Sequence, residues 1–316
     1  MAAIRTVGLT KRYGSLAALD SLDLEVPEGD VLGYLGPNGS GKTTTIRLLL
    51  GLIRATAGRA EIFGADCQSD PVAVHRRLAY VPGEVALWPS LTGTETLHLL
   101  GRVQGRVDAA YRQELIERFE LDPSRRVRSL SKGNRQKLVL IAALMSRADL
   151  LLLDEPTSGL DPLKEREFQA CLAEAQARGQ TVFLSSHLLS EVEATCHRVA
   201  ILRAGRLVEI GRLDELRHLA AMQVEAELEG PVPSLDGVPG LSGVTVDGTT
   251  VRCQVVGGIG PLLSVLTPVG VRRLVSREPS LEELFLSRYG GRYGDPDDGP
   301  PTVLEPAAPD RSGASR

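Results

Sequence analysis

The sequence lacks an apolar run long enough to cross a membrane. Its longest apolar stretches lie around residues 48–53, 138–145 and 150–153. They fall far short of the roughly 18 residues that a spanning helix requires. The amino-terminal segment MAAIRTVGLTKRYG also has no apolar core of the kind found in secretory signals. We therefore expect a soluble chain, and any membrane role must come through a partner.

Cysteine and net charge are also scarce. The four cysteines stand far apart, with no CxxC pair (Cys67, Cys171, Cys196 and Cys253). This spacing excludes a disulfide frame or a zinc site and indicates reduced thiols. A net charge of −4 gives no overall basic field, so no nucleic-acid partner is expected. With 42% hydrophobic and 24% charged residues in a chain of 316, the composition is globular and allows more than one domain.

One motif carries the clearest chemistry. The stretch GPNGSGKTT has the spacing G-x-x-x-x-G-K-[ST] of a phosphate-binding loop. Its glycines let successive backbone N–H groups turn toward a phosphate, and its lysine reaches the terminal phosphates. The apolar segment 31–35 predicts a strand before it and 44–53 a helix after it, which is the required setting. The candidate binding residues are Gly36, Pro37, Asn38, Gly39, Ser40, Gly41, Lys42, Thr43 and Thr44. The motif alone leaves a kinase, a GTPase or a motor open.

Strand and helix patterns alternate up to about residue 213. Residues 4–26 predict two antiparallel strands that turn at residues 13–15. Further strands are expected at 59–64, 150–153 and 181–186, helices at 70–78, 108–121 and 163–178, and a hairpin over 197–211 that turns at Ala204 and Gly205. Residues 79–105 predict a loop that enters a helix, and Ser131 is the expected N-cap of another helix. The pattern predicts one α/β domain with a mostly parallel sheet.

The composition changes after residue 213. Residues 214–221 predict a helix, and Asp247-Gly248 predicts a tight hairpin turn. Short strands are expected at 223–230, 242–246, 250–256 and 271–276, and a closing helix at 279–290. Residues 214–290 are therefore predicted to form a small α+β domain. Residues 291–316, rich in proline, glycine and aspartate, are predicted to be a disordered tail.

Four more motifs follow the phosphate-binding loop in a fixed order. They are LSKGN at 130–134, LLLLDEP at 150–156, SGLD at 158–161 and SSH at 185–187. With these motifs, residues 1–213 resemble the ATP-binding subunit of an ABC transporter. The sequence segments LSKGNRQK, VPGEVALWPSLT and PSLEELFL resemble those of daunorubicin-resistance-type (ABC-2) drug and antibiotic exporters. The resemblance implies an ABC-type P-loop ATPase domain, with an N-terminal antiparallel subdomain and a helical subdomain, followed by the small C-terminal domain.

The chemistry of ATP hydrolysis assigns roles within these motifs. The reaction needs neutralised phosphate charge, a fixed Mg²⁺ ion and an aligned water. Lys42 is expected to contact the β- and γ-phosphate oxygens, and Thr43 and Asp154 to hold Mg²⁺. Glu155, at the end of a strand beside Asp154, is the candidate general base. Tyr13 could stack on adenine or pack within the protein, and its position favours neither.

The resemblance implies a dimer with two composite sites. His187 would contact the γ-phosphate and the facing subunit, and Asp161 would link the two sites. Ser131 and Gly133 would contact ATP bound to the opposite subunit. The expected partners are a second copy of this chain, forming a homodimer, and a separate membrane-spanning permease. Through the permease the chain would lie at the cytoplasmic face of the cell membrane.

Some positions depart from the usual pattern of the family. Gly83 and Glu84 stand where a glutamine normally follows YVP. The usual contact with Mg²⁺, water and the membrane subunit is therefore in doubt, unless Glu84 substitutes. Lys132 and Asn134 replace a glycine and a glutamine of the signature. Lys132 could face phosphate or solvent, and we favour solvent.

Trp88 lies in the segment predicted to be a loop that enters a helix. Its side chain could be buried or offered to a partner, and we expect burial.

The expected function is ATP binding and hydrolysis that powers the export of a hydrophobic drug- or antibiotic-like compound through the permease. One alternative is a soluble ABC ATPase with a regulatory role and no transport. Another is an import ATPase, which is disfavoured because these three segments resemble those of exporters. The exported compound cannot be derived from this sequence, because an ATPase subunit need never touch it.

Overall fold

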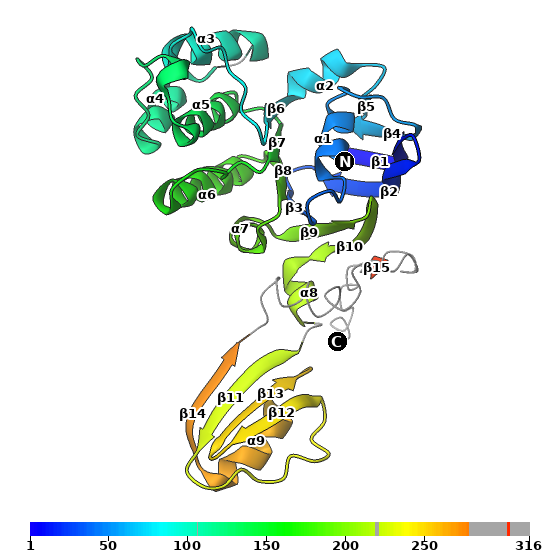
Figure 1. The fold of residues 1–316 in the computed structure, drawn as a ribbon, viewed down its shortest axis with the longest axis vertical. Helices are drawn as coiled ribbons and strands as arrows, with labels where there is room; N and C mark the ends of the chain where they lie inside the picture. The colour runs from blue at the N-terminus through cyan, green and yellow to red at the C-terminus, as the bar shows by residue number, and fades with distance from the viewer. Residues whose placement is uncertain (106, 219–220, 278–301, 304–316) are drawn as a thin grey trace, which may run out of the picture. The chain divides into compact units, whose positions relative to one another are not determined.

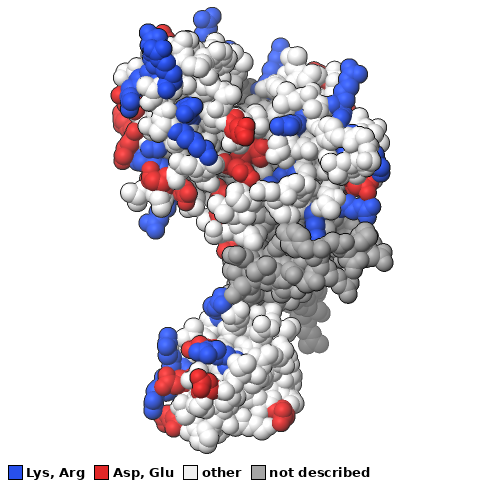
Figure 2. Space-filling model, viewed as in Figure 1, with Lys and Arg blue, Asp and Glu red and all other residues white. Residues whose placement is uncertain are grey.

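The computed structural model describes residues 1–105, 107–218, 221–277 and 302–303 (Figure 1). Among these, residues 1–211 with 302–303 form one compact unit, and residues 212–277 form a second. Figure 2 shows basic and acidic side chains interspersed on the visible face of each unit. None of the helices in the described ranges is long and apolar enough to cross a membrane.

The larger unit opens with an antiparallel sheet in the order β2-β1-β4-β5. Its strands are β1 (Ala2–Tyr13), β2 (Leu16–Pro27), β4 (Ala57–Ile62) and β5 (Ala65–Asp66). Strands β1 and β2 form a hairpin in which Tyr13 pairs with Leu16. The predicted antiparallel pair and its turn are confirmed. Apolar side chains from alternate positions of these strands, such as Leu22 and Leu24, are buried in the core.

A central sheet in the order β15-β10-β9-β3-β8-β7-β6 forms the rest of the larger unit's framework. Its strands are β3 (Val31–Leu35), β6 (Leu78–Val81), β7 (Leu150–Asp154), β8 (Thr181–Ser186), β9 (Arg198–Arg203), β10 (Arg206–Arg212) and β15 (Thr302–Val303). Strand β3 pairs in parallel with β8 and β9, and β7 pairs in parallel with β6 and β8. Every residue of β3, β7 and β8 is buried, as expected for a parallel sheet covered on both faces. The mostly parallel sheet is confirmed.

Helices surround this sheet. They are α1 (Lys42–Leu49), α2 (Pro71–Arg77), α3 (Gly93–Gln104), α4 (Ala109–Arg118), α5 (Lys132–Leu144), α6 (Pro162–Ala177) and α7 (Leu189–Thr195), with the short 3₁₀ turn η1 (Val127–Ser129). Figure 1 shows α3, α4 and α5 gathered on the β6 and β7 side, away from the antiparallel sheet. Helix α1 ends before Gly51, which has a left-handed φ of 65°, so the predicted extension to residue 53 is wrong. Strand β6 and helix α7 were not predicted.

Helix α1 packs against strand β3 in the core of the larger unit. Ile46, Leu48 and Leu49 of α1 are fully buried, together with Tyr34 of β3. The Tyr34 ring lies 4.9 Å from that of Phe183, between centroids, and its hydroxyl lies 3.0 Å from the hydroxyl of Thr45. Strand β3 and helix α1 are thus fixed together on either side of the phosphate-binding loop.

All four cysteines are buried and none forms a disulfide, which agrees with the expectation of reduced thiols. Burial raises the pKa of Cys67, Cys171 and Cys196 to about 12, and it also raises the pKa of Cys253.

The second unit contains helix α8 (Leu213–His218) and a four-stranded antiparallel sheet in the order β12-β13-β11-β14. The strands are β11 (Met222–Leu228), β12 (Leu241–Asp247), β13 (Thr250–Val255) and β14 (Val271–Arg277), with α9 (Gly260–Leu266) and η2 (Thr267–Val269) between the last two. Alternate residues of β11 and β13 pack with Leu262 and Leu266 of α9 in a separate core. The four predicted strands are confirmed, and α9 was not predicted.

Two expectations fall largely outside the described residues. The helix predicted at 279–290 lies wholly outside them. Of the predicted disordered tail, 291–316, only Thr302 and Val303 are described. These two residues form β15, which pairs in parallel with Glu209 and Ile210 of β10, so at this point a short strand replaces the predicted disorder.

Candidate active site

The phosphate-binding loop joins the carboxyl end of β3 to α1, where only glycine fits at two positions. A Cβ atom on Gly36 would lie 2.4 Å from the Leu202 carbonyl oxygen. Gly41 has a φ of 113°, and a Cβ there would lie 2.6 Å from the Ala18 carbonyl oxygen. The loop is also anchored by the Gly205 N–H, which donates to the Ser40 carbonyl over 2.9 Å. The surrounding strands therefore fix its course.

Lys42 begins α1 and turns back over the loop. Its amine donates to the carbonyl oxygens of Gly36 over 2.5 Å and of Pro37 over 3.3 Å. Burial lowers the pKa of this amine, and the carboxylates of Glu155 and Asp154 oppose that shift. The first N–H groups of α1 have no partner within the helix, and the buried Ser40 hydroxyl has none at all. This concentration of unused donors beside a buried cation fits a bound phosphate chain.

Asp154 ends β7 and is 5% exposed. The Ser185 hydroxyl of β8 donates to its Oδ1 over 3.0 Å. Burial raises the pKa of Asp154, whereas hydrogen bonds from Ser185 and Thr43 lower it. The structure thus places Asp154 beside Thr43, and a buried carboxylate with a neighbouring hydroxyl fits a Mg²⁺ ion completed by phosphate oxygens and water. Among the described residues, no cluster of three or more His, Cys, Asp or Glu could hold a metal.

Gly83 faces Asp154 with enough space between them for a Cβ atom. A Cβ on Gly83 would lie 3.4 Å from the Asp154 carbonyl oxygen and 3.7 Å from its Cγ, which are ordinary contact distances. The side chain of Glu84 is exposed. Position 83 therefore has room for a side chain beside Asp154, although this chain supplies none.

Glu155 and His187 meet at the carboxyl ends of two neighbouring parallel strands, β7 and β8. Glu155 has a left-handed φ of 47°, and its N–H donates to the Ser185 carbonyl over 2.9 Å. This conformation is costly for a residue other than glycine and is typical of functional sites. It brings Glu155 Oε1 to 3.0 Å from His187 Nδ1. Both side chains are partly exposed, at 33% and 46%, so the pair is accessible to a substrate.

The remaining candidates lie at the starts of two helices, α5 and α6. Ser131 is the N-cap of α5, as predicted, and its hydroxyl accepts from Asn134 N over 3.2 Å. Asp161 is the N-cap of α6, and its carboxylate accepts from the backbone N–H groups of Leu163 and Lys164. These backbone hydrogen bonds, that of Lys164 first, lower the pKa of Asp161.

Close packing joins these two helix starts. A Cβ on Gly133 would lie 2.6 Å from the Gly159 carbonyl oxygen. The exposed Lys132 amine donates to the Ser158 hydroxyl over 3.1 Å. The favoured exposure of Lys132 to solvent is confirmed, but its hydrogen bond to the neighbouring loop was not predicted. The signature motif and SGLD therefore form one surface.

Known proteins are similar to this chain in sequence and fold. Residues 19–158 match the family described as ABC transporter. The daunorubicin resistance ATP-binding protein DrrA3 of Streptomyces coeruleorubidus is 36% identical over 306 residues, which cover 91% of this chain and 96% of the relative. The chain belongs to the ABC transporter family. The predicted resemblance to daunorubicin-resistance-type ATP-binding proteins is confirmed.

Two further comparisons extend this result. The bacitracin transport ATP-binding protein BcrA of Bacillus licheniformis is 34% identical, with 91% of this chain and 97% of the relative covered. A solved ATP-binding subunit of an ABC transporter is 30% identical, with a TM-score of 0.64 over 68% of this chain and 92% of that chain. A dimeric bacterial ABC transporter cassette, 23% identical, shares the fold with a TM-score of 0.61 over 66% of this chain and 98% of that chain. The predicted ABC-type P-loop ATPase fold is confirmed.

Two aromatic residues of this ABC protein lie at the surface. Tyr13 ends β1 and is 48% exposed, with the Lys11 amine 4.9 Å from its ring centroid. The ring is thus available for stacking on a base. Trp88 is 50% exposed, so its expected burial is wrong. The prolines and glycines around Trp88 keep that segment in an irregular surface loop, where the general preference of tryptophan for burial does not apply.

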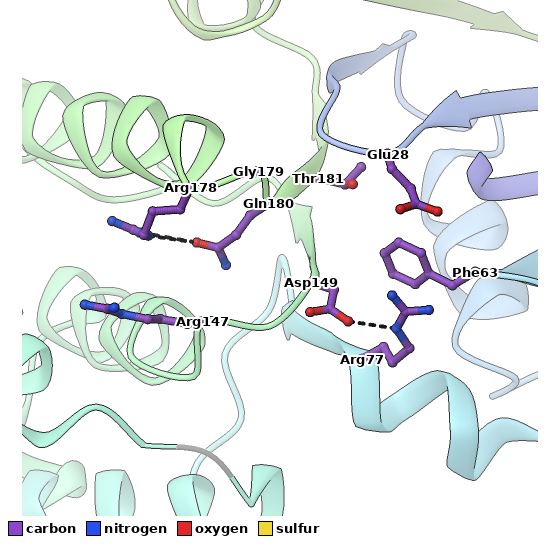
Figure 3. Close-up of a pocket in the computed structure, with 9 residues that line it drawn as sticks. All are labelled: Glu28, Phe63, Arg77, Arg147, Asp149, Arg178, Gly179, Gln180 and Thr181. Atoms are coloured by element: carbon purple, nitrogen blue, oxygen red, sulfur yellow. Dashed lines mark hydrogen bonds and ion pairs between the residues drawn. The ribbon is translucent and has the colours of Figure 1, made fainter. Parts of the chain in front are cut away.

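A cavity of about 370 Å³ lies near the amino ends of the central strands, whereas the candidate site lies at their carboxyl ends (Figure 3). It is lined by residues that precede or begin strands, including Asp149 before β7 and Thr181 at the start of β8. Arg77 stacks 3.7 Å from the Phe63 ring centroid and pairs with Asp149 over 2.7 Å. Ligands of open α/β sheets bind at the carboxyl ends of the strands. This cavity is therefore not the nucleotide site.

Sequence reasoning missed one residue that shapes the site. It assigned no role to Ser185, although this serine donates a hydrogen bond to Asp154. The motif SSH contained a signal for Ser185, because a hydroxyl at the end of a strand next to β7 can reach the last carboxylate of β7. The place of Gly83 beside Asp154 agrees with the expected position of this segment near Mg²⁺.

Proposed function

We propose that this chain binds and hydrolyses ATP and so powers the export of a hydrophobic drug- or antibiotic-like compound through a separate membrane-spanning subunit. The observation that carries the proposal is the meeting of Lys42, Asp154 and the Glu155–His187 pair at one edge of the sheet. The functions of two relatives, daunorubicin resistance and bacitracin transport, support the class of compound. They also support export over import or a purely regulatory role.

Each group of the site has a part in hydrolysis. The loop from Gly36 to Thr44 holds the phosphates through its backbone N–H groups, and Lys42 moves from its carbonyl partners to the β- and γ-phosphate oxygens. Thr43 and Asp154 hold Mg²⁺, which when bound neutralises charge on those phosphates. Glu155 accepts a proton from the attacking water, and His187 orients Glu155 and contacts the γ-phosphate. Tyr13 stacks on adenine.

The site is completed by a second copy of the chain. The N-terminus of α5, with Ser131 and Gly133, contacts the γ-phosphate of ATP held by the partner, since backbone N–H groups and the helix dipole favour an anion there. Asp161, on the same surface, links the two sites of the homodimer. We assign residues 1–213 to the ATP-binding domain and 214–290 to a C-terminal α+β domain. The dimer lies at the cytoplasmic face of the membrane through its permease.

Copurification tests the transport role. Co-expression with the neighbouring reading frame, where that frame encodes about six spanning segments, should yield a complex whose ATP hydrolysis exceeds that of the chain alone. The Glu155→Gln variant is the matched control, because it should still copurify while hydrolysing no ATP. A chain that hydrolyses ATP equally well alone and retains no membrane protein would instead indicate the regulatory alternative.

Stacking on Tyr13 predicts a selective loss of affinity. Tyr13→Ala should weaken ATP binding about tenfold, since stacking of a base on an aromatic ring contributes about 1–3 kcal/mol. Tyr13→Phe keeps the ring and should bind almost normally. Titration with a fluorescent ATP analogue measures both. Leu16→Ala, which alters the exposed residue paired with Tyr13, is the control and should have no effect. Equal affinity in Tyr13→Ala would exclude stacking.

A further inference from the structure

Helix α7 carries a buried carboxylate next to the Glu155–His187 pair. Glu191 lies in the first turn of α7 and is only 8% exposed. Its Oε2 accepts a hydrogen bond from the Ser186 hydroxyl over 2.5 Å, whereas its buried Oε1 has no partner within hydrogen-bond distance. Burial raises the pKa of Glu191, as does the charge of Glu165, while the side chains of Ser186 and Thr157 lower it. Burying such a group costs stability unless all its atoms are paired, so packing alone does not explain it.

Ser186, the residue before His187, forms hydrogen bonds with residues that follow His187 in the chain. The Ser186 hydroxyl, besides donating to Glu191, accepts from the Leu188 N–H over 3.0 Å. Glu191 therefore fixes the residue before His187 directly, and the residue after it through Ser186. His187 lies between these two points, with its Nδ1 3.0 Å from Glu155 Oε1.

Helix α7 is itself held firmly against the sheet. A Cβ on Gly33 of β3 would overlap Val192 Cγ1, at a separation of 2.3 Å, so these two elements pack as closely as glycine permits. The Thr195 hydroxyl also donates to the Glu191 carbonyl over 2.7 Å. Glu191 is therefore a fixed point from which the segment carrying His187 can be oriented.

We propose that Glu191 is a positioning residue, which holds Ser186 and Leu188 so that His187 meets Glu155 in the orientation needed for hydrolysis. This proposal rests on the proposed ATPase function. Small displacements of a reacting group are costly, since a shift of about 1 Å can lower a rate by about a hundredfold. ATP binding should not depend on Glu191, because its carboxylate interacts with Ser186 before His187 and with Thr157 after Glu155, rather than with the phosphate-binding loop.

Steady-state ATP hydrolysis by the full-length chain tests this role. Glu191→Ala should lower kcat about tenfold or more and leave KM for ATP within about twofold, because it leaves Ser186 without its acceptor. Glu191→Gln should restore kcat to within about threefold of the wild type, since an amide oxygen can still accept from Ser186. Leu172→Ala is the matched control. It truncates a buried side chain of helix α6, outside α7, and it should lower the melting temperature but not kcat.

A double-mutant cycle with Ser186→Ala separates positioning from general destabilisation. If Glu191 acts through Ser186, Ser186→Ala alone should lower kcat, and adding Glu191→Ala should lower it little further. Should Glu191→Ala fail to fold, Ser186→Ala and Glu191→Gln still report on the same contact. An unchanged kcat in Glu191→Ala, full additivity of the two changes, or a similar loss of kcat in Leu172→Ala would overturn the proposal. If wild-type protein hydrolyses no ATP, or Glu155→Gln is fully active, the ATPase function itself fails instead.

Discussion

Glu155→Gln should bind ATP with nearly wild-type affinity and lose almost all turnover. The amide matches the carboxylate in size but cannot accept a proton from the attacking water, and loss of a general base lowers a rate by about 10²–10⁴-fold. The phosphate-binding loop and Lys42 are unchanged, so the substrate should still bind. With hydrolysis blocked, ATP should hold two chains together. Steady-state hydrolysis, nucleotide titration and size-exclusion chromatography with ATP measure these three results.

Glu84→Gln is the control for this experiment. Glu84 follows Gly83, which faces Asp154, but the side chain of Glu84 is exposed. If Glu84 took over a role in the reaction, its amide variant would also lose activity. Near-normal turnover in Glu84→Gln together with an inactive Glu155→Gln would assign the base to Glu155. Normal turnover in Glu155→Gln would exclude the mechanism.

Gly41→Ala should abolish measurable ATP binding. An alanine at this position must adopt a φ of 113° and place its Cβ 2.6 Å from the Ala18 carbonyl oxygen. A left-handed conformation costs a non-glycine residue about 1–2 kcal/mol, and here a backbone clash is added. Because Gly41 directly precedes α1, the loop can relieve the clash only by moving the donors that bind phosphate. We expect the dissociation constant for ATP to rise at least about a hundredfold, which corresponds to about 2.7 kcal/mol.

Gly64→Ala supplies the matched comparison for this substitution. Gly64 also has a left-handed φ, of 78°, but a Cβ there would meet no atom within 4 Å. It lies between β4 and β5, outside the phosphate-binding loop. The variant should lose about 1 kcal/mol of stability and bind ATP normally. Equal binding by Gly41→Ala and the wild type, with both folded by thermal melting, would contradict the assigned role of the loop.

The phosphate-binding loop and the Glu155–His187 pair could be predicted from the sequence for the same reason. The loop and the Glu155–His187 pair follow from topology, because parallel neighbouring strands end at the same edge of a sheet. Strand β6 was missed because its four residues run into Pro82 and resemble the loop that follows. Helix α7 was missed because seven residues are too few for a clear period of 3.6.

Contacts between distant segments could not be predicted in this way. Lys132 reaches Ser158 only because α5 packs beside the loop before α6. This contact leaves no periodic or local signal. The half-exposed Trp88 shows the same limit, since burial depends on what the rest of the fold places around a loop.

The buried cysteines make the chain suitable for site-specific labelling. Alkylating reagents react with thiolates, and all four native thiols are both enclosed and held in the protonated form at neutral pH. A cysteine introduced at an exposed position would thus be modified selectively in the wild-type background. Leu163, which is 69% exposed and lies two residues after Asp161, is such a position. A spectroscopic probe attached there would report the approach of a second chain without prior removal of any native cysteine.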